Sequence, residues 1–163
     1  MALAIHVARK RMMNEDKSCP IELAAQLLID KWSVVILRDV AFFNRLSFRD
    51  ILTKNLENIS SSTLSSRLKR LQDLNLLTRK DDLHHAQKRL YYLTEGSIQL
   101  VPMLIQMAIW TSKFRNPSVE ILNLLEPIMS ENNSHLDRMI EGLREIHLLG
   151  QSKDPFWWRA LTT

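Results

Sequence analysis

The stretch Ile59–Leu76, ISSSTLSSRLKRLQDLNL, decides the fold that the sequence predicts. Its leucines recur at helical spacing and predict one buried face, formed by Leu64, Leu68, Leu71 and Leu74. Ser60 or Ser61 can cap the start of this helix, since a short hydroxyl accepts a hydrogen bond from a backbone N–H. The opposite face carries small hydroxyls first and long cations later, namely Ser62, Ser66, Lys69 and Arg70. Such a face favours contact with an anion, and its N-terminal end is small enough to enter a groove.

Two short strands are predicted after this helix, at Leu77–Lys80 and Arg89–Leu93. A polar tip of seven residues, DDLHHAQ, joins them into a hairpin. The hairpin carries four cations, Arg79, Lys80, Lys88 and Arg89. A helix followed by a basic hairpin is the layout of a winged helix-turn-helix, in which the hairpin is the wing.

The helices upstream complete this arrangement. Pro20 suits the first position of a helix that ends near Ile29, and a strongly apolar helix follows at Lys31–Phe43. Ser47 is predicted to cap a short helix, Phe48–Lys54, and a polar turn then leads into the helix after Ile59. The Ser47 hydroxyl and Arg49 could bind a phosphate at the start of that short helix. Alternatively Ser47 is only a cap, and both roles can hold at once.

The segments outside this core are also predicted to be helical. A short helix fits within residues 2–13, and Thr94 is expected to cap a long helix that reaches about Phe114 and is bent at Pro102. This long helix is apolar nearly all round, which predicts that it pairs with a second copy of the chain. Two more amphipathic helices are predicted at Val119–Met129 and Leu136–Leu149, before an aromatic tail expected to fold back.

The positive charge of the chain is concentrated around the predicted helix and hairpin. The 163 residues carry a net charge of +4. Residues 45–93 hold ten Lys or Arg and five Asp or Glu, whereas residues 116–149 hold two and six. A local excess of cations is typical of a nucleic-acid-binding surface. The alternative is a solvated basic surface without a partner.

Composition argues against several other classes of protein. A single cysteine excludes an internal disulfide framework and favours a reducing cytoplasm. Neither a signal peptide nor an apolar run of membrane-spanning length is present, so a soluble protein without a membrane partner is expected. With three glycines and no catalytic motif, we expect neither an enzyme nor a cofactor. Adjacent His84 and His85 make a poor chelating pair, so no metal site is expected.

Taken together, these motifs resemble the HxlR-type transcriptional regulators, winged-helix proteins near the MarR family. The resemblance runs from Cys19 to about Trp110 and rests on CPIE at 19–22, KWSVVILRDV at 31–40, LSFRDI at 46–51, the spacing of residues 59–71, LLTRK at 76–80 and YYLT at 91–94. It implies a bacterial homodimer on double-stranded operator DNA, with the recognition helix in the major groove. By position, bases would be contacted by Ser61, Ser62, Ser65 and Ser66, and phosphates by Lys69, Arg70 and the wing cations.

The resemblance also implies that dimers pair through the N-terminal helix and residues 97–114. Two positions depart from the family pattern, since Asn75 stands where glycine is usual and a glycine expected at residue 97 appears as Gly96. Cys19 matches the position of a redox-sensing thiol in several family members. A thiol at a helix N-terminus has a depressed pKa and is then reactive, but the alternative is a buried cap residue.

We therefore predict a mainly α fold with a small β-hairpin wing, a winged helix-turn-helix with a long dimerisation helix and a helical C-terminal extension. The predicted boundaries are 1–18 for an N-terminal arm, 19–115 for the winged helix domain and 116–163 for the extension. The predicted function is that of a sequence-specific regulator acting as a homodimer on operator DNA, with a redox or small-molecule effector as a further option. The alternative is a winged-helix module for protein–protein assembly.

Overall fold

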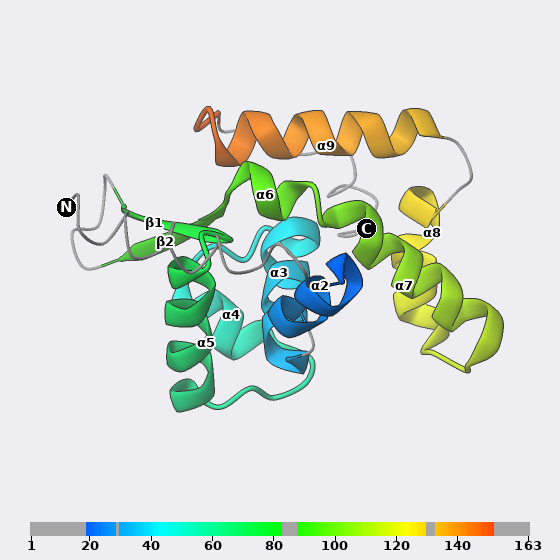
Figure 1. Ribbon diagram of the computed structural model, residues 1–163, viewed down its shortest axis with the longest axis horizontal. Helices are drawn as coiled ribbons and strands as arrows, with labels where there is room; N and C mark the ends of the chain where they lie inside the picture. Colours follow the sequence, from blue (N-terminus) through cyan, green and yellow to red (C-terminus); the bar gives the residue numbers. More distant parts are fainter. Residues whose placement is uncertain (1–18, 29, 83–87, 130–132, 152–163) are drawn as a thin grey trace. The chain divides into compact units, whose positions relative to one another are not determined.

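The computed structural model describes residues 19–28, 30–82, 88–129 and 133–151 (Figure 1). Contacts between Cα atoms divide the chain into two compact units, Met1–Asp30 and Lys31–Thr163. In the first unit the described helix is α2, Pro20–Leu28, which begins at the predicted proline. Proline suits this place because an N–H in the first turn of a helix has no partner within the helix. The helix predicted within residues 2–13 lies outside the described residues.

Three helices of the second unit form the helix-turn-helix. They are α3, Lys31–Phe43, α4, Phe48–Lys54, and α5, Ser61–Asp73, and all three confirm the predicted elements. Helix α5 packs against both α3 and α4 through its leucine face. The side chains at the centre of this core are fully buried, among them Ile36, Val40, Ile51, Leu64 and Leu71. The spacing of apolar residues in the sequence therefore identified the buried faces of these helices, except that Leu74, the C-cap of α5, is only half-buried.

The predicted hairpin is confirmed, with one strand a residue longer. Strand β1, Leu77–Asp81, pairs antiparallel with β2, Arg89–Leu93, from Leu77 opposite Leu93 to Asp81 opposite Arg89. The connection between α3 and α4 adds to the outer edge of β2. Ser47 forms an isolated bridge with Leu90, and the Tyr91 N–H donates to the Leu46 carbonyl at 2.8 Å.

The link between α5 and β1 turns sharply at Asn75. Its φ of 55° lies in the left-handed region, which asparagine tolerates better than most residues. The Leu76 N–H donates to the Leu71 carbonyl at 2.8 Å, which closes the end of the helix. Asparagine thus supplies the conformation for which a glycine is usual at this place.

The single helix predicted from Thr94 to Phe114 is two helices in the structure. They are α6, Glu95–Ile98, and α7, Val101–Phe114. Thr94 caps α6 as predicted, in a capping box with Ser97. Pro102 lies in the first turn of α7 and has no N–H to donate to the Ile98 carbonyl, as a continuous helix would require. The proline therefore separates two helices rather than bending one.

Two further helices follow α7. Helix α8 spans Val119–Met129 as predicted. Helix α9 spans Asn133–His147, so it begins at 133 rather than 136 and ends at 147 rather than 149. Helix α9 lies along α6 and contacts both α6 and β2, with Met139, Leu143 and Ile146 buried (Figure 1). The aromatic tail lies outside the described residues. None of the helices in the described part of the chain is long and apolar enough to cross a membrane.

Candidate nucleic-acid interface

Helix α5 presents a row of hydroxyls to solvent. The N-cap is Ser60, whose Oγ accepts a hydrogen bond from the Thr63 N–H at 3.2 Å. Because Ser60 caps the helix, the serines of the first two turns are not needed to satisfy this backbone donor. The exposed side chains of this helix include Ser61, Ser62, Ser65, Ser66 and Lys69, whereas Arg70 is half-buried. The small residues thus come first and the cations later, as the sequence predicts.

A buried polar cluster anchors the turn that leads into α5. At its centre Asp39 is completely buried in α3. One of its carboxylate oxygens accepts a hydrogen bond from Arg38 Nη2 at 2.7 Å. The other accepts from Arg45 Nη1 and from Asn55 Nδ2, each at 3.1 Å. Both oxygens of a buried carboxylate are thereby satisfied, two of the donors being charged guanidinium groups.

The same cluster holds the backbone at the end of the turn. The Asn55 side-chain oxygen accepts hydrogen bonds from the N–H groups of Glu57 at 3.1 Å and Ile59 at 3.2 Å. Arg38 also forms a two-pronged ion pair with Glu57, with Nη1–Oε1 at 2.5 Å and Nη2–Oε2 at 2.9 Å. The hydrogen bond from Arg38 lowers the pKa of the Glu57 carboxyl group. Helix α3 therefore fixes the position at which α5 starts.

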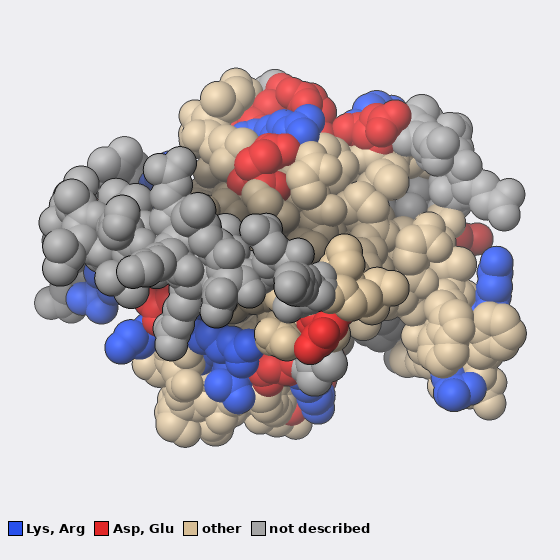
Figure 2. Space-filling model, viewed as in Figure 1, with Lys and Arg blue, Asp and Glu red and all other residues tan. Residues whose placement is uncertain are grey.

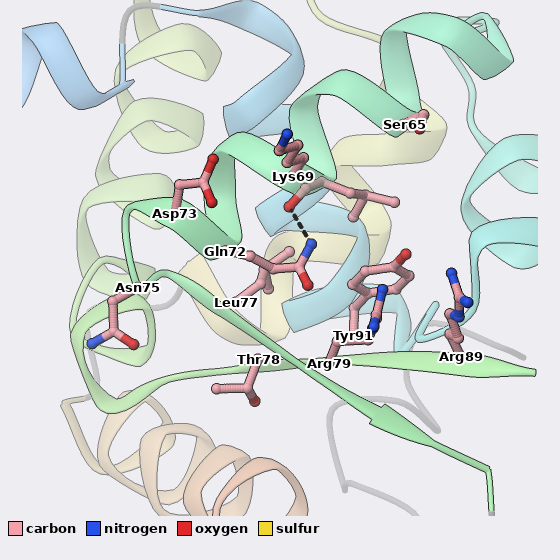
Figure 3. A pocket seen from close by; sticks show the side chains of 11 residues that line it. Ser65, Lys69, Gln72, Asp73, Asn75, Leu77, Thr78, Arg79, Arg89 and Tyr91 are labelled. Atoms are coloured by element: carbon pink, nitrogen blue, oxygen red, sulfur yellow. Dashed lines mark hydrogen bonds between the residues drawn. The ribbon is translucent and has the colours of Figure 1, made fainter. Parts of the chain in front are cut away.

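A hollow of about 740 Å³, here called the α5–wing groove, lies between α5 and the hairpin. Its walls come from α5, from the turn after it and from both strands, with Ser65, Leu68, Lys69, Gln72, Asp73, Asn75, Leu77, Thr78, Arg79, Arg89 and Tyr91. Figure 3 shows Arg79, Arg89 and Tyr91 rising from the hairpin toward the helix. Lys69 lies on the helix side, so a polyanion in this groove would meet cations from both elements.

A second hollow of about 830 Å³ adjoins the groove at the start of α4. It shares Ser65, Arg89 and Tyr91 with the α5–wing groove and is also lined by Ser47, Phe48, Arg49, Asp50 and Lys88. The Ser47 hydroxyl caps α4: it accepts from the Asp50 N–H at 3.0 Å and donates to the Asp50 carboxylate at 2.5 Å. This confirms the predicted cap, and the phosphate contact of Ser47 stays a prediction. Arg49 is exposed beside it.

The other predicted residues lie outside the two hollows or carry additional contacts. Ser61, Ser62 and Ser66 are exposed on α5 but line neither hollow. Lys80 stacks its ammonium group on the Tyr92 ring, 5.1 Å from the centroid. The two-residue alternation of a strand places Lys80 on the face of the hairpin opposite Arg79. Lys88 Nζ lies 3.6 Å from Asp82 Oδ2.

Charge is unevenly distributed over the second unit. Figure 2 shows Lys and Arg side chains gathered below the hairpin and toward α5, and Asp and Glu side chains prominent over α9. The exposed acidic residues of α9 include Asp137 and Glu141. This asymmetry agrees with the segment charges of the sequence and leaves the α5 side favourable for a polyanion.

Sequence reasoning missed the residues that hold this surface in place. Asp39 lies in the helix that the sequence predicted only as strongly apolar, and the ion-pairing roles of Arg38, Arg45 and Glu57 were not predicted. A carboxylate within a buried apolar stripe is itself a signal, because it must find buried partners. The role of His147 at the end of α9, described below, had no such signal in the sequence.

Cys19 lies at the N-terminus of α2 with an exposed thiol. Hydrogen bonds from the backbone N–H groups of Glu22 and Ile21 lower the pKa of this thiol. The buried-cap alternative for Cys19 is therefore wrong, since the residue is exposed. His84 and His85 lie outside the described residues, and within the described part of the chain no three His, Cys, Asp or Glu residues are grouped as metal ligands.

Comparison with known proteins assigns the chain to a family. Residues 27–119 match the model of the HxlR-like helix-turn-helix family. An uncharacterized HTH-type transcriptional regulator of Halalkalibacterium halodurans is 31% identical over 107 residues, which cover 66% of this chain and 94% of that protein.

Solved structures agree with this placement. The reduced form of the transcriptional regulator YodB from B. subtilis superposes with a TM-score of 0.52 at 29% identity, covering 62% of this chain and 98% of YodB. PA1607, described as a candidate transcription factor, has a TM-score of 0.56 over 66% of this chain and 72% of its own; at 23% identity it supports the fold alone. The chain therefore belongs to the HxlR-like helix-turn-helix family and is a transcriptional regulator.

Proposed function

We propose that this regulator acts as a homodimer that binds operator DNA sequence-specifically through α5 and the hairpin. The observation that carries the proposal is the α5–wing groove, which is lined by Lys69 of the helix and by Arg79 and Arg89 of the hairpin. Cations on two elements at one groove fit a phosphate backbone, and the exposed hydroxyls at the start of the helix fit base edges.

In the proposed complex the first two turns of α5 enter the major groove. Ser61, Ser62, Ser65 and Ser66 would then contact base edges, since a hydroxyl both donates and accepts. Phosphates on either side would be bound by the cations Arg49, Lys69, Arg70, Arg79, Lys80, Lys88 and Arg89. At the start of α4 a phosphate contact would fall to Arg49, which is exposed in the second hollow, because Ser47 is buried and its hydroxyl is bonded to Asp50.

The homodimer is proposed from the apolar surface of α7. Three large apolar side chains of this helix are exposed: Met107 by 47%, Trp110 by 52% and Phe114 by 59%. They lie on one face, spaced by three and four residues, and the Trp110 and Phe114 rings are 5.6 Å apart. A contiguous apolar patch of this kind is typical of a protein–protein interface, and the family resemblance points to the same helix.

A redox response is proposed at Cys19. The lowered pKa of this exposed side chain favours the thiolate, which is the form that reacts with oxidants, and YodB, a relative, has been described in a reduced form. The chain has one cysteine, so oxidation would join two subunits or add a small thiol adduct.

The direct test is DNA binding by the purified protein, reduced and then oxidised with diamide. Duplexes from the region upstream of its own gene would be compared with a mixed-sequence duplex at two salt concentrations. We expect selective binding that weakens steeply with salt, because bound cations release counterions from DNA. Loss of binding on oxidation that Cys19→Ser prevents would support the redox response. Binding that is neither selective nor salt-dependent would contradict the proposal and favour the assembly module.

A further inference from the structure

Strand β2 directs several of its backbone donors away from β1, among them those of Tyr91 and Leu93. In the antiparallel ladder, Tyr91 and Leu93 occupy positions whose N–H groups point outward, while alternate residues bond to β1. The Tyr91 N–H is satisfied by the Leu46 carbonyl, within the helix-turn-helix itself. The Leu93 N–H instead donates to the imidazole Nδ1 of His147 at 3.2 Å. The last residue of helix α9 thus completes the buried edge of the hairpin.

The contact between His147 and the hairpin is enclosed. His147 is 2% exposed, and its ring meets the Tyr92 ring edge-on, with 5.9 Å between the centroids. A neutral imidazole is needed here, because a protonated Nδ1 could not accept the hydrogen bond from Leu93. Without His147 the buried N–H would be unsatisfied, at a cost of about 1–3 kcal/mol.

A second contact of α9 lies just beyond the end of β2. The Arg144 guanidinium binds the Glu95 carboxylate, with Nη2–Oε1 at 2.6 Å and Nε–Oε2 at 3.0 Å. Glu95 is the first residue of α6, two residues after the strand ends. Helix α9 therefore holds the chain on both sides of Thr94, at the root of the hairpin.

We propose that α9 is a brace that fixes the hairpin relative to α5, with His147 and Arg144 as positioning residues for DNA binding. The inference rests on the proposed function, because the brace would act by holding the hairpin cations in position for DNA. A two-stranded hairpin is marginally stable alone, and a fixed hairpin loses less conformational freedom when Arg79 and Arg89 bind phosphate. Helix α9 lies beyond residue 119, where the match to the family model ends.

The first test compares His147→Leu with His147→Asn. Leucine removes the acceptor, whereas the asparagine side-chain oxygen can take the place of Nδ1. We expect His147→Leu to weaken binding to a labelled mixed-sequence duplex about tenfold and to speed hydrogen exchange of the Leu93 amide, and His147→Asn to restore both. Wild-type affinity in His147→Leu, with the Leu93 amide exchanging fast, would overturn the proposal.

A double-mutant cycle separates positioning from a general loss of stability. If the brace acts through the hairpin, Arg89→Ala should weaken DNA binding less in the His147→Leu background than in the wild type. It should also lower the salt dependence of binding less in that background. Equal effects of Arg89→Ala in both backgrounds would show that His147 contributes only to the stability of the fold and does not position the hairpin.

The exposed ion pair supplies a milder test that does not depend on a core substitution. Arg144→Glu should weaken DNA binding severalfold, and the exchange Glu95→Arg with Arg144→Glu should restore it. The result that overturns the brace is unchanged affinity in the Arg144→Glu variant. Salt-dependent binding by the wild type with no effect of these variants would reject the brace alone. An absence of binding by the wild type would instead reject the proposed function, and the brace with it.

Discussion

At the scale of single residues, Asp39 and His147 are buried titratable side chains that hold the proposed interface in place. Asp39 ties α3 to the turn before α5, and His147 ties α9 to β2. Neither lines the α5–wing groove. Their contribution to DNA binding would therefore be indirect, through the position of α5 and of the hairpin.

Replacing Asp39 with asparagine is expected to destabilise the fold. The substitution removes the charge that pairs with Arg38 and Arg45, whose side chains are only 22% and 13% exposed. Loss of one partner of a buried ion pair costs about 3–5 kcal/mol. Urea denaturation should show this as a lower midpoint. Asp50→Asn is the control, because Asp50 pairs with Lys54 at the surface; an equal effect of the two substitutions would contradict the role of the cluster.

Because His147 is buried, we predict that the free energy of unfolding falls in mild acid. Burial, reinforced by Lys80 nearby, lowers the pKa of His147 from 6.5 to about 4. Because the folded state disfavours the proton, this stabilising contribution is complete above pH 6.5 and is lost as the pH falls toward 4. The shift corresponds to roughly 3 kcal/mol. Denaturant unfolding at several pH values should show the loss in the wild type and its absence in His147→Asn.

At the scale of elements, the sequence predicted each helix and strand of the described chain except the break between α6 and α7. Regular apolar spacing and capping residues are local signals, so α3, α4 and α5 could be placed within a residue or two. The break depends on a hydrogen bond that Pro102 cannot make to Ile98. Asp39 within an apolar helix signals that buried partners exist, but which partners it has, and the His147 contact, could not be predicted, because they join residues far apart along the chain.

The cap of α5 is expected to contribute to stability at this scale. Ser60→Ala removes the side-chain acceptor of the Thr63 N–H, and loss of such a cap costs about 1 kcal/mol. Ser61→Ala is the matched control, since Ser61 is exposed in the first turn and is not the N-cap. Thermal unfolding of both variants should show a lower midpoint for Ser60→Ala. Equal midpoints would mean that the cap contributes nothing.

At the scale of the whole molecule, the proposed dimer explains the apolar face of α7. Trp110→Glu would place an unpaired charge in the interface, and such a buried charge costs several kcal/mol. We expect the dissociation constant of the dimer to rise by about a hundredfold or more. Sedimentation velocity would measure the change.

Leu56→Glu is the control for the dimer experiment, because Leu56 is 56% exposed on the turn before α5. A Trp110→Glu variant that stays dimeric would show that α7 is not the interface. The sequence predicted this surface from an excess of apolar residues, but it could not predict that α9 reaches the root of the hairpin. That arrangement depends on the packing of the whole second unit.

The central claim, that α5 and the hairpin together bind DNA, is tested most directly by the salt dependence of binding. Affinity for one duplex would be measured across salt concentrations for the wild type, Lys69→Ala and Arg89→Ala, with Lys113→Ala as the control. We predict that each of the first two substitutions lowers the slope of log affinity against log salt by about one per subunit. Lys113→Ala, on α7, should leave the slope unchanged. Wild-type slopes in Lys69→Ala and Arg89→Ala would contradict the account.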